Sequence, residues 1–352
     1  MNLVHGGDWA GFAARYGQAP LDFSVNVSPL GMPEGVRRAI AGAIPDAERY
    51  PDPLCRALRA KLAEKENVPI DWVLCGSGAA ELIFSAVLAR RPRRALLPVP
   101  TFAEYEAALR TADCRSSYYA LREENGFALN GGILSLLQPG VDMVFLCQPN
   151  NPTGRTMPRP LLLKILARCK EIGALLVTDE CFLDFLDDPA AFTLTGALGE
   201  YPNLLILRSF TKLYAMAGVR LGYCLTSDPA LPEAMRSAGP PWSVSTLAQA
   251  AGLAALEERD YAKQVRALIQ TERPWLTTRL EGLGLRVIPG EANFLLFRCG
   301  TPLSTPLGRR GILLRECGNS RGLDAAWYRA AVRTRPDNER LIGALREVLR
   351  HG

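Results

Sequence analysis

The sequence is poor in histidine: its 352 residues include only two, His5 and His351. A zinc site built on histidines and a serine–histidine catalytic pair are therefore close to excluded, and we expect no metal site. Nine cysteines are present, but none belongs to a C-x-x-C pair, and those such as Cys75 and Cys147 lie beside apolar residues. We expect reduced core thiols rather than a disulfide framework.

A strong excess of charge and long apolar runs are also missing. The 41 basic and 36 acidic residues are spread along the chain and leave a net charge of +5, so no basic tail or stripe indicates a nucleic-acid partner. No apolar run reaches the length of a membrane span, and residues 1–17 lack the pattern of a secretory leader. We therefore expect a cytoplasmic protein that binds neither nucleic acid nor membrane.

The chain is 48% hydrophobic and long enough to bury a large core. From residue 72 onward, short apolar runs alternate with helical patterns, which is typical of an α/β fold with a mostly parallel sheet. We predict a large α/β domain at residues 45–235 and a smaller α+β domain made of residues 1–44 and 236–352. The predicted strands of the large domain are residues 73–75, 95–99, 143–147, 175–178 and 204–207.

The flanking segments have helix and strand patterns of their own. Apolar residues at helical spacing alternate there with prolines and with short apolar runs. The predicted helices are residues 33–43, 54–66, 245–280 and 338–350, the predicted strands are 285–288, 293–297 and 312–315, and residues 301–307 are expected to form an irregular loop.

Each of the five large-domain strands is followed by polar or glycine-rich sequence. In chain order these strand tails contain GSGAAE, PTFAEY, QPNNPTG, DECF and RSFTK. Ligands of open α/β sheets gather at the carboxyl ends of the strands. The five tails should therefore meet at one ligand-binding site.

The last tail, RSFTK, ends in Lys212. A lysine just past a buried strand can be desolvated, which lowers the pKa of its amine and leaves it able to form a Schiff base with a carbonyl. The hydroxyls of Ser209 and Thr211, together with Arg220, would bind a phosphate. An aldehyde and a phosphate on one molecule describe pyridoxal 5′-phosphate, PLP. Taken alone, however, such a lysine is more often a solvated surface residue.

Two further tails suit the same ligand, although each has an ordinary structural alternative. Gly78, Ala79 and Ala80 lie between a strand and a helix, where backbone N–H groups form an anion site or simply a tight turn. Asp179 ends a buried strand, where an unpaired carboxylate is costly, so it needs a cationic partner. That partner is either a protonated pyridine nitrogen or a neighbouring arginine.

The remaining tails are individually ambiguous in the same way. Asn151 can donate to a phenolate oxygen of the cofactor, but Asn-Pro also marks a common turn. Phe102 could stack on a pyridine ring, whereas a single aromatic residue more often belongs to the core. The five features follow one another in order, each after a predicted strand, and we interpret the set as a PLP site.

The ordered motifs RYPDP, GSGAAE, PTF, QPNNPTG, DECF and SFTKLYAMAGVRLGY resemble the fold-type I PLP enzymes of the class I and II aminotransferase family, in the branch of the histidinol-phosphate aminotransferases. The resemblance covers nearly the whole chain. It implies that Lys212 anchors the cofactor and that Asp179 pairs with its pyridine nitrogen. It also implies a homodimer with shared active sites, in which Tyr50 reaches the cofactor phosphate of the neighbouring subunit. The other implied cofactor contacts are Asn151 to the phenolate oxygen, Phe102 on the ring, and Gly78, Ala79, Ala80, Ser209, Thr211 and Arg220 around the phosphate.

Several stretches resemble one group within that branch. HGG, LDFSVNVSPLG, GILLRECGNSRGL and YRAAVRTRPDNERLI are similar to threonine-phosphate decarboxylases, which make aminopropanol phosphate for cobalamin biosynthesis. Phe182 agrees with this, because typical aminotransferases have a tyrosine three residues after the aspartate. The resemblance implies that Arg329 and Asn151 bind the substrate carboxylate. The side chains implied for the substrate phosphate are His5, Asn26 and Arg315.

The reaction depends on which bond at the substrate α-carbon stands perpendicular to the cofactor ring. If the bond to the carboxylate is perpendicular to the ring, decarboxylation is favoured. If the bond to the hydrogen is perpendicular, transamination is favoured. We expect a PLP-dependent decarboxylase of L-threonine O-3-phosphate, with a histidinol-phosphate-type aminotransferase as the alternative. A PLP-binding protein without turnover is the remote alternative.

Overall fold

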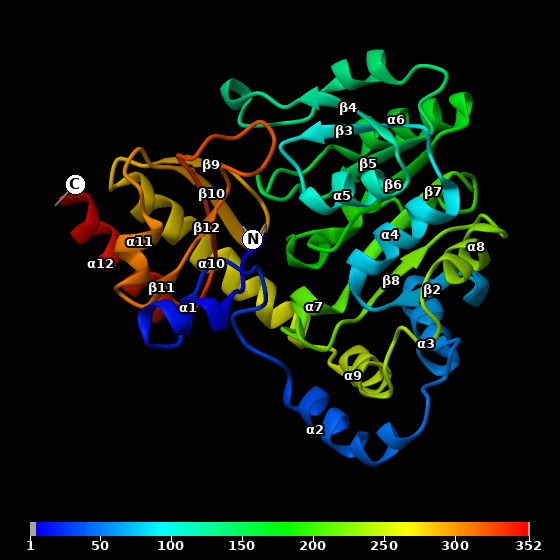
Figure 1. The fold of residues 1–352 in the computed structure, drawn as a ribbon, viewed down its shortest axis with the longest axis horizontal. Coiled ribbons are helices and arrows are strands. Elements are labelled where there is room, and N and C mark those ends of the chain that lie inside the picture. Colours follow the sequence, from blue (N-terminus) through cyan, green and yellow to red (C-terminus); the bar gives the residue numbers. More distant parts are fainter. Residues whose placement is uncertain (1–4, 351–352) are drawn as a thin grey trace.

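The computed structural model describes residues 5–350, so His351 lies outside the described residues. Its centre is a seven-stranded sheet in the order β2-β8-β7-β6-β5-β3-β4 (Figure 1). Neighbouring strands are parallel, except that β8 runs antiparallel to both β2 and β7. The strands are β2 (Val73–Gly76), β3 (Arg94–Val99), β4 (Arg115–Ala120), β5 (Met143–Cys147), β6 (Leu175–Asp179), β7 (Leu204–Ser209) and β8 (Gly222–Leu225).

Helices cover both faces of this sheet because its central strands are apolar on both sides. In β5, Val144 and Leu146 belong to one hydrophobic core, whereas Phe145 and Cys147 belong to the other. Side chains of α6 pack in the first core, and side chains of α4, α5 and α8 pack in the second. These helices are α4 (Gly78–Arg90), α5 (Ala103–Thr111), α6 (Arg159–Ile172) and α8 (Leu231–Ala238).

A second, antiparallel sheet in the order β12-β13-β10-β9 lies to one side of the large sheet (Figure 1). Helix α10 packs against β9 and β10, and α12 packs against α10 and α11. The elements are β9 (Arg286–Ile288), β10 (Phe294–Arg298), β12 (Arg315–Glu316), β13 (Trp327–Ala331), α10 (Tyr261–Glu281), α11 (Ser304–Gly308) and α12 (Arg335–Arg350).

A strand of the N-terminal segment pairs with a strand of the C-terminal part of the chain beside the smaller sheet. Strand β1 pairs in parallel with β11, which brings the N-terminal segment against the C-terminal part of the chain. Helix α9 packs against both α2 and α3 at the bottom of Figure 1. The elements are α1 (Trp9–Tyr16), β1 (Leu21–Asp22), α2 (Glu34–Gly42), α3 (Arg56–Glu66), α9 (Thr246–Glu257) and β11 (Ile312–Leu313).

Short helical turns complete the connections. The short elements are η1 (Ile44–Glu48), η2 (Ile70–Trp72), η3 (Glu123–Asn125), η4 (Gly131–Leu136), η5 (Leu183–Phe185), η6 (Pro189–Ala191), η7 (Thr195–Ala197) and α7 (Phe210–Leu213).

Within residues 5–350, no helix is both long enough and apolar enough to span a membrane.

The predicted fold class and all five predicted large-domain strands are confirmed, but three local predictions are wrong. The stretch 245–280 is two helices, α9 and α10, because the charged run EERD at 257–260 has no apolar side chain to bury. Residues 301–307 contain most of α11 rather than an irregular loop. The predicted strand 312–315 is split at Leu314 into β11 and β12, which pair with different sheets.

Candidate active site

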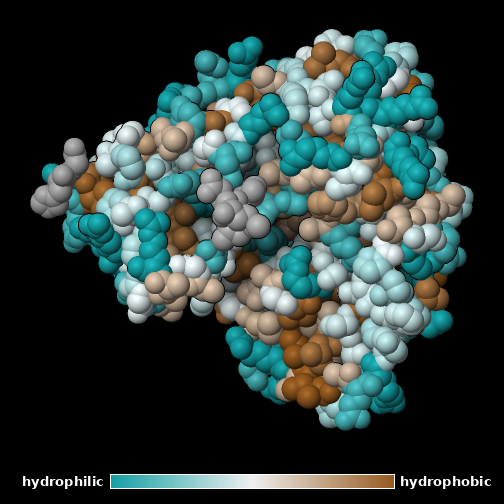
Figure 2. Space-filling view, viewed as in Figure 1, coloured by the Kyte–Doolittle hydropathy of each residue, from teal (hydrophilic) through white to brown (hydrophobic). Residues whose placement is uncertain are grey.

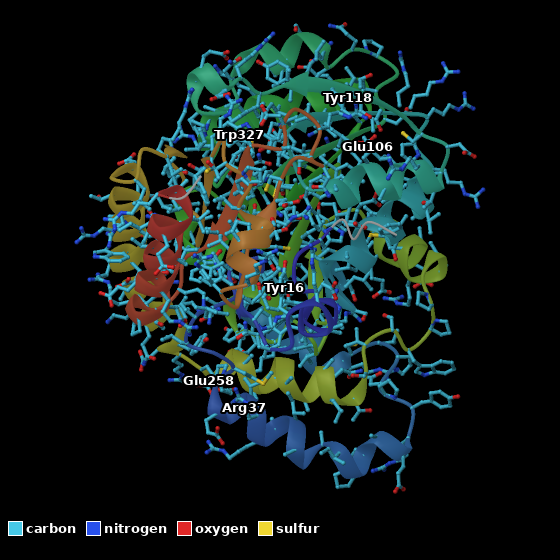
Figure 3. All side chains as sticks on the ribbon, turned by 60° about the vertical axis from the view of Figure 1, so that its left-hand side comes forward. Tyr16, Arg37, Glu106, Tyr118, Glu258 and Trp327 are labelled. Atoms are coloured by element: carbon cyan, nitrogen blue, oxygen red, sulfur yellow. The ribbon has the colours of Figure 1, made fainter. Side chains whose placement is uncertain are left out.

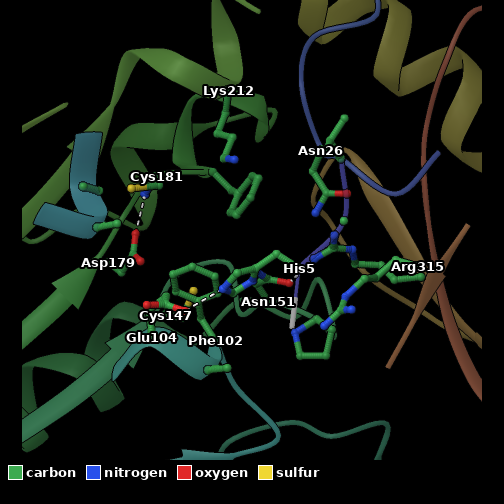
Figure 4. A pocket seen from close by; sticks show the side chains of 18 of the residues that line it. His5, Asn26, Phe102, Glu104, Cys147, Asn151, Asp179, Cys181, Lys212 and Arg315 are labelled. Atoms are coloured by element: carbon green, nitrogen blue, oxygen red, sulfur yellow. Dashed lines mark hydrogen bonds and ion pairs between the residues drawn. The ribbon is translucent and has the colours of Figure 1, made fainter. Parts of the chain in front are cut away.

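One pocket of about 430 Å³ receives residues from all five strand tails (Figure 4), as the sequence predicted. It is bounded on the other side by the smaller sheet and the N-terminal segment, and Figure 2 shows the surface hollowed between these two parts of the molecule. The predicted site residues that line the pocket are His5, Asn26, Ala79, Ala80, Phe102, Asn151, Asp179, Ser209, Thr211, Lys212, Arg220, Arg315 and Arg329.

Lys212 projects into this pocket from α7, directly after β7. The helix begins there because the Ser209 side chain caps it, accepting a hydrogen bond from the Thr211 N–H at 3.2 Å. Burial is the main cause that lowers the pKa of Lys212, and the charges of Arg329 and Arg220 act in the same direction. The amine is therefore easier to deprotonate than that of an ordinary lysine, as the sequence analysis anticipated.

A compact group of donors lies next to Lys212. The hydroxyl oxygens of Ser209 and Thr211 are 2.7 Å apart. Arg220 adopts a left-handed backbone conformation with a φ of 61°, uncommon for a residue with a side chain, and its guanidinium lies over Gly78. A β-carbon at Gly78, where φ is 83°, would lie 2.6 Å from Nη2 of Arg220. Glycine therefore lets the arginine approach the first turn of α4, where free N–H groups favour an anion.

Asp179 is buried at the end of β6 and accepts two hydrogen bonds. The Tyr105 hydroxyl donates to Oδ2 at 2.6 Å, and the Cys181 N–H donates to Oδ1 at 3.0 Å. The neighbouring buried arginine, Arg208, instead forms an ion pair with Glu180 at 3.0 Å. The carboxylate of Asp179 therefore faces the pocket rather than serving that arginine.

Two guanidinium groups lie close together on the opposite side of the pocket. Arg329, in β13, donates from Nη1 to Asn151 Oδ1 at 2.5 Å and from Nη2 to the Ser24 carbonyl at 2.7 Å. Arg315, in β12, stands opposite Arg329 in the strand register. Burial, helped by the charge of Arg315, lowers the pKa of Arg329 to about 10. An anion bound between them would relieve this repulsion.

The N-terminal segment borders the pocket on the same side as Arg315 and Arg329. The amide of Asn26 is buried, and its Oδ1 has no hydrogen-bond partner among residues 5–350. His5 Nε2 lies 2.5 Å from Glu104 Oε1, and the His5 ring is 5.8 Å from the Phe102 ring (Figure 4). These polar groups face a pocket that already contains two arginines, which suits a ligand with an anionic group.

Phe182 occupies the position at which the sequence lacks a tyrosine hydroxyl. Its ring centroid is 5.9 Å from the Lys212 amine. The ring packs edge-on against the Phe294 ring, and the two ring centroids are 5.1 Å apart. The side chain therefore presents only carbon to the Lys212 end of the pocket.

Two predicted site residues do not line the pocket. Gly78 lies behind the Arg220 guanidinium. Tyr50 is 80% exposed and stacks on Trp242, with ring centroids 4.6 Å apart. Its predicted contact belongs to a neighbouring subunit, so that role stays a prediction.

Several groups in or beside the pocket were not predicted from the sequence. Tyr105 and Glu104 lie in the predicted tail PTFAEY, but nothing distinguishes them there from ordinary helix residues. Cys181, in the predicted tail DECF, also lines the pocket. Cys317 and Ser320 line it too, and their positions depend on how the chain folds back. Only the proximity of Cys181 to Asp179 in the sequence could have identified one of them.

A parallel-dominated sheet with a buried lysine, an aspartate and an arginine in one pocket at its strand ends, together with the family match, defines a fold-type I PLP-dependent enzyme. The chain belongs to the aminotransferase class I and II family, whose model matches residues 19–345. Enzymes of this family depend on PLP.

Individual relatives cover almost the whole chain. A threonine-phosphate decarboxylase of Salmonella typhimurium is 42% identical over 99% of this chain and 97% of its own length. A histidinol-phosphate aminotransferase of Symbiobacterium thermophilum is 35% identical over 93% of this chain and 90% of its own. The structure of a histidinol-phosphate aminotransferase of Sinorhizobium meliloti, in complex with PLP, has a TM-score of 0.88 at 23% identity and covers 98% of this chain and 95% of that one.

Proposed function

We propose that the pocket residues hold PLP in the roles the sequence predicted for them. Lys212 would anchor the aldehyde, and Asp179 would pair with the ring nitrogen. Ser209, Thr211 and Arg220 would bind the phosphate. The absence of a β-carbon at Gly78, directly below the Arg220 guanidinium, supports this fit, because the backbone N–H groups of the turn stay accessible.

Bound PLP supplies an electron sink for the electrons of a bond broken at the substrate α-carbon. The protein has to choose that bond and manage the proton. Lys212, buried and with a lowered pKa, is suited to carry a proton between its Nζ and the α-carbon. Asp179, fixed by Tyr105 and the Cys181 N–H, would hold the ring nitrogen protonated.

The reaction we propose is decarboxylation of L-threonine O-3-phosphate to aminopropanol phosphate, a step of cobalamin biosynthesis. One observation carries the substrate assignment: besides Lys212 and Arg220, the pocket holds a second cationic group made of Arg315 and Arg329. A substrate with both a carboxylate and a phosphate matches it. The 42% identity to a threonine-phosphate decarboxylase over nearly the full chain supports the same choice.

In this arrangement Arg329 would grip the substrate carboxylate. Its guanidinium is already fixed by Asn151 and by the Ser24 carbonyl, so little side-chain entropy is lost on binding. Arg315, His5 and Asn26 would hold the phosphate. Anchoring both ends of the substrate fixes its rotation about the α-carbon, which selects the bond that breaks.

A histidinol-phosphate-type aminotransferase is the alternative, because it would share every proposed cofactor contact. Relatives with that name reach 35% identity. Phe182 favours the decarboxylase, since the aminotransferase pattern has a hydroxyl at this position. The alternative predicts release of no carbon dioxide.

The test is to incubate the purified holoenzyme with L-threonine O-3-phosphate, or with histidinol phosphate plus 2-oxoglutarate, and to identify the products by mass spectrometry. Carbon dioxide and aminopropanol phosphate from the first incubation would support the proposal. Glutamate from the second, with no carbon dioxide from the first, would establish the aminotransferase instead.

Dimerisation and domain organisation are further proposals. We propose a homodimer with shared active sites, in part because Figure 2 shows a hydrophobic area at the bottom of the molecule and because several large apolar side chains are exposed. They include Leu30 and Ile44, and exposed Tyr50 and Trp242 are stacked on each other. We keep the division into residues 45–235 and residues 1–44 with 236–352, and a cytoplasmic location, as predictions.

A further inference from the structure

The first turn of α5 carries two glutamates that contact both ends of the chain. Glu104 Oε1 lies 2.5 Å from His5 Nε2 in the N-terminal segment. Glu106 Oε1 accepts a hydrogen bond at 3.0 Å from Nη2 of Arg321, in the loop between β12 and β13. Side chains two residues apart on a helix point in different directions, so each carboxylate can hold a different segment. We call these contacts the N-terminal clasp and the C-terminal clasp.

The C-terminal clasp consists of three side chains. The Tyr118 hydroxyl, from β4, donates to the same Glu106 oxygen at 2.9 Å, and the Arg321 guanidinium lies 4.1 Å from the centroid of the Tyr118 ring. Figure 3 shows Glu106 and Tyr118 close together at the edge of the large sheet. Burial acts to raise the pKa of Glu106, but hydrogen bonds from Arg321 and Tyr118 outweigh it and lower that pKa overall. The carboxylate is therefore ionised at neutral pH.

The loop held by this clasp is otherwise loosely packed against α5. A cleft of about 390 Å³ lies between them, lined by Glu106 and Arg110 on one side and by residues 318–323 on the other. The same loop places Ser320 in the active-site pocket, and Asn319 accepts a hydrogen bond from Arg315 at 2.9 Å. The Arg321 contact is therefore one of those that hold this wall of the pocket.

The N-terminal clasp is connected to the pocket in a similar way. The Gly7 N–H donates to Ser24 Oγ at 2.8 Å, and a β-carbon at Gly6 would lie 2.5 Å from the Ser24 carbonyl oxygen, so the segment rests directly on Ser24. That carbonyl accepts the hydrogen bond from Arg329. A shift of His5 would therefore reach the guanidinium on the opposite side of the pocket.

We propose that Glu104 and Glu106 are positioning residues that hold His5 and the 317–323 loop over the pocket, and thereby set its affinity for a phosphorylated substrate. They act through His5 and Arg321 and take no part in breaking the bond. The identity of the substrate rests on the proposed function, whereas the clasps themselves do not.

The negative charge of Glu104 provides a test, because two different roles for this residue predict opposite changes in phosphate affinity. Glu104 lines the pocket, so an isolated carboxylate there would repel a phosphate, and its replacement by glutamine would tighten binding. If Glu104 instead positions His5, Glu104→Gln weakens binding, because the imidazole is no longer held beside the phosphate. The two roles thus predict opposite changes.

The experiment uses the PLP-loaded protein and titrates L-threonine O-3-phosphate and, separately, inorganic phosphate by calorimetry. We expect Glu104→Gln, Glu106→Gln and Arg321→Gln each to weaken binding of both ligands by about twofold to fivefold, as for partly exposed ion pairs. KM should rise by the same factor, with kcat unchanged. Hydrogen–deuterium exchange should increase in the N-terminal peptide for the first variant and in peptide 317–323 for the other two.

The matched control is Glu347→Gln, which removes an exposed ion pair with Arg310 of the same 3.0 Å length away from the pocket. It should change neither binding nor exchange in those peptides. The double variant E106Q/R321Q should bind no more weakly than the worse single variant, because both substitutions break one contact.

Tighter phosphate binding by Glu104→Gln would overturn the N-terminal clasp. Fully additive losses in the double variant, or unchanged exchange in peptide 317–323, would overturn the C-terminal clasp. Failure of the parent enzyme to release carbon dioxide from L-threonine O-3-phosphate would overturn the proposed function alone, because inorganic phosphate binding and exchange still report on the clasps.

Discussion

The two ends of the pocket differ in how their polar groups are satisfied. At the end proposed to hold the cofactor, which we call the cofactor end, Asp179 accepts two hydrogen bonds, and the hydroxyls of Ser209 and Thr211 bond each other. At the substrate end, two arginines with lowered pKa values stand opposite each other on neighbouring strands. The first end is preorganised before any ligand binds, whereas the second gathers like charges that an anion would neutralise.

The two ends also come from different parts of the sequence. The predicted cofactor contacts in the pocket lie between Ala79 and Arg220, on the strand ends of one sheet. The predicted contacts with the substrate phosphate come from residues 5–26 and from β12 near the other end of the chain. Such a division lets a protein change its substrate without disturbing the cofactor site. It fits a family in which relatives carry the names of a decarboxylase and of aminotransferases.

The largest effect should follow from removing Lys212, the proposed covalent anchor at the cofactor end. We expect Lys212→Ala to abolish the absorbance band of lysine-bound PLP and to reduce turnover by at least about 10³-fold, because both the anchor and the proton carrier are lost. Spectra and product assays measure the two effects. Lys164→Ala, at an exposed lysine of α6, is the control and should leave both unchanged. A retained band in Lys212→Ala would remove this lysine from the site.

A large but distinct effect is expected from Arg329→Gln at the substrate end. Loss of a charge-assisted carboxylate contact should lower kcat/KM by about 10- to 100-fold. Because the charge of Arg329 helps to lower the pKa of Lys212, its removal should raise that pKa. The pH midpoint for reconstituting the apoenzyme with PLP should therefore move upward, since the amine must lose its proton to react.

Arg329→Lys separates these two effects. It keeps the positive charge, so the reconstitution midpoint should stay near that of the parent protein. It loses the forked geometry that binds a carboxylate, so kcat/KM should remain low. If Arg329→Lys and Arg329→Gln shift the midpoint equally, the electrostatic link between the two ends is wrong.

A smaller effect should come from closing the space under Arg220. We expect Gly78→Ala to weaken PLP binding by about tenfold, because its β-carbon would displace the guanidinium and because φ there is 83°. Fluorescence titration of the apoenzyme with PLP measures the change. Gly300→Ala is the control, since a β-carbon at that position meets no atom within 4 Å. Equal affinities for both variants would argue against the proposed phosphate cradle.

The cofactor end was largely predictable because each group follows a strand. Asp179 ends the strand β6, Lys212 lies three residues after the end of β7, and the parallel order of β5, β6 and β7 brings the strand ends to one edge. Periodicity located those strands to within two residues. The parallel order of the strands then predicted that their carboxyl ends form one site, without knowledge of any side-chain contact.

The substrate end was less accessible to that reasoning. Arg315 and Arg329 were expected only from the resemblance, because arginines in an irregular region are usually surface residues. Glu104, Glu106 and Arg321 were not expected at all, since their contacts cross between segments that are about 100 to 215 residues apart. Contacts between such distant, partly exposed side chains leave no periodic pattern in the sequence.

The smallest predicted effect adds one hydroxyl to the cofactor end. Phe182→Tyr adds a hydroxyl to a ring that lines the pocket and whose centroid is 5.9 Å from the Lys212 amine. A donor to the phenolate oxygen would lower the pKa of the proton shared between that oxygen and the lysine nitrogen that binds the cofactor. One such hydrogen bond should lower the pH midpoint of the cofactor absorbance change by about half to one unit. Phe182→Leu, which removes the ring without adding a donor, should not produce this shift. If both variants shift the midpoint equally, packing against Phe294 rather than the missing hydroxyl sets the electronic state of the cofactor.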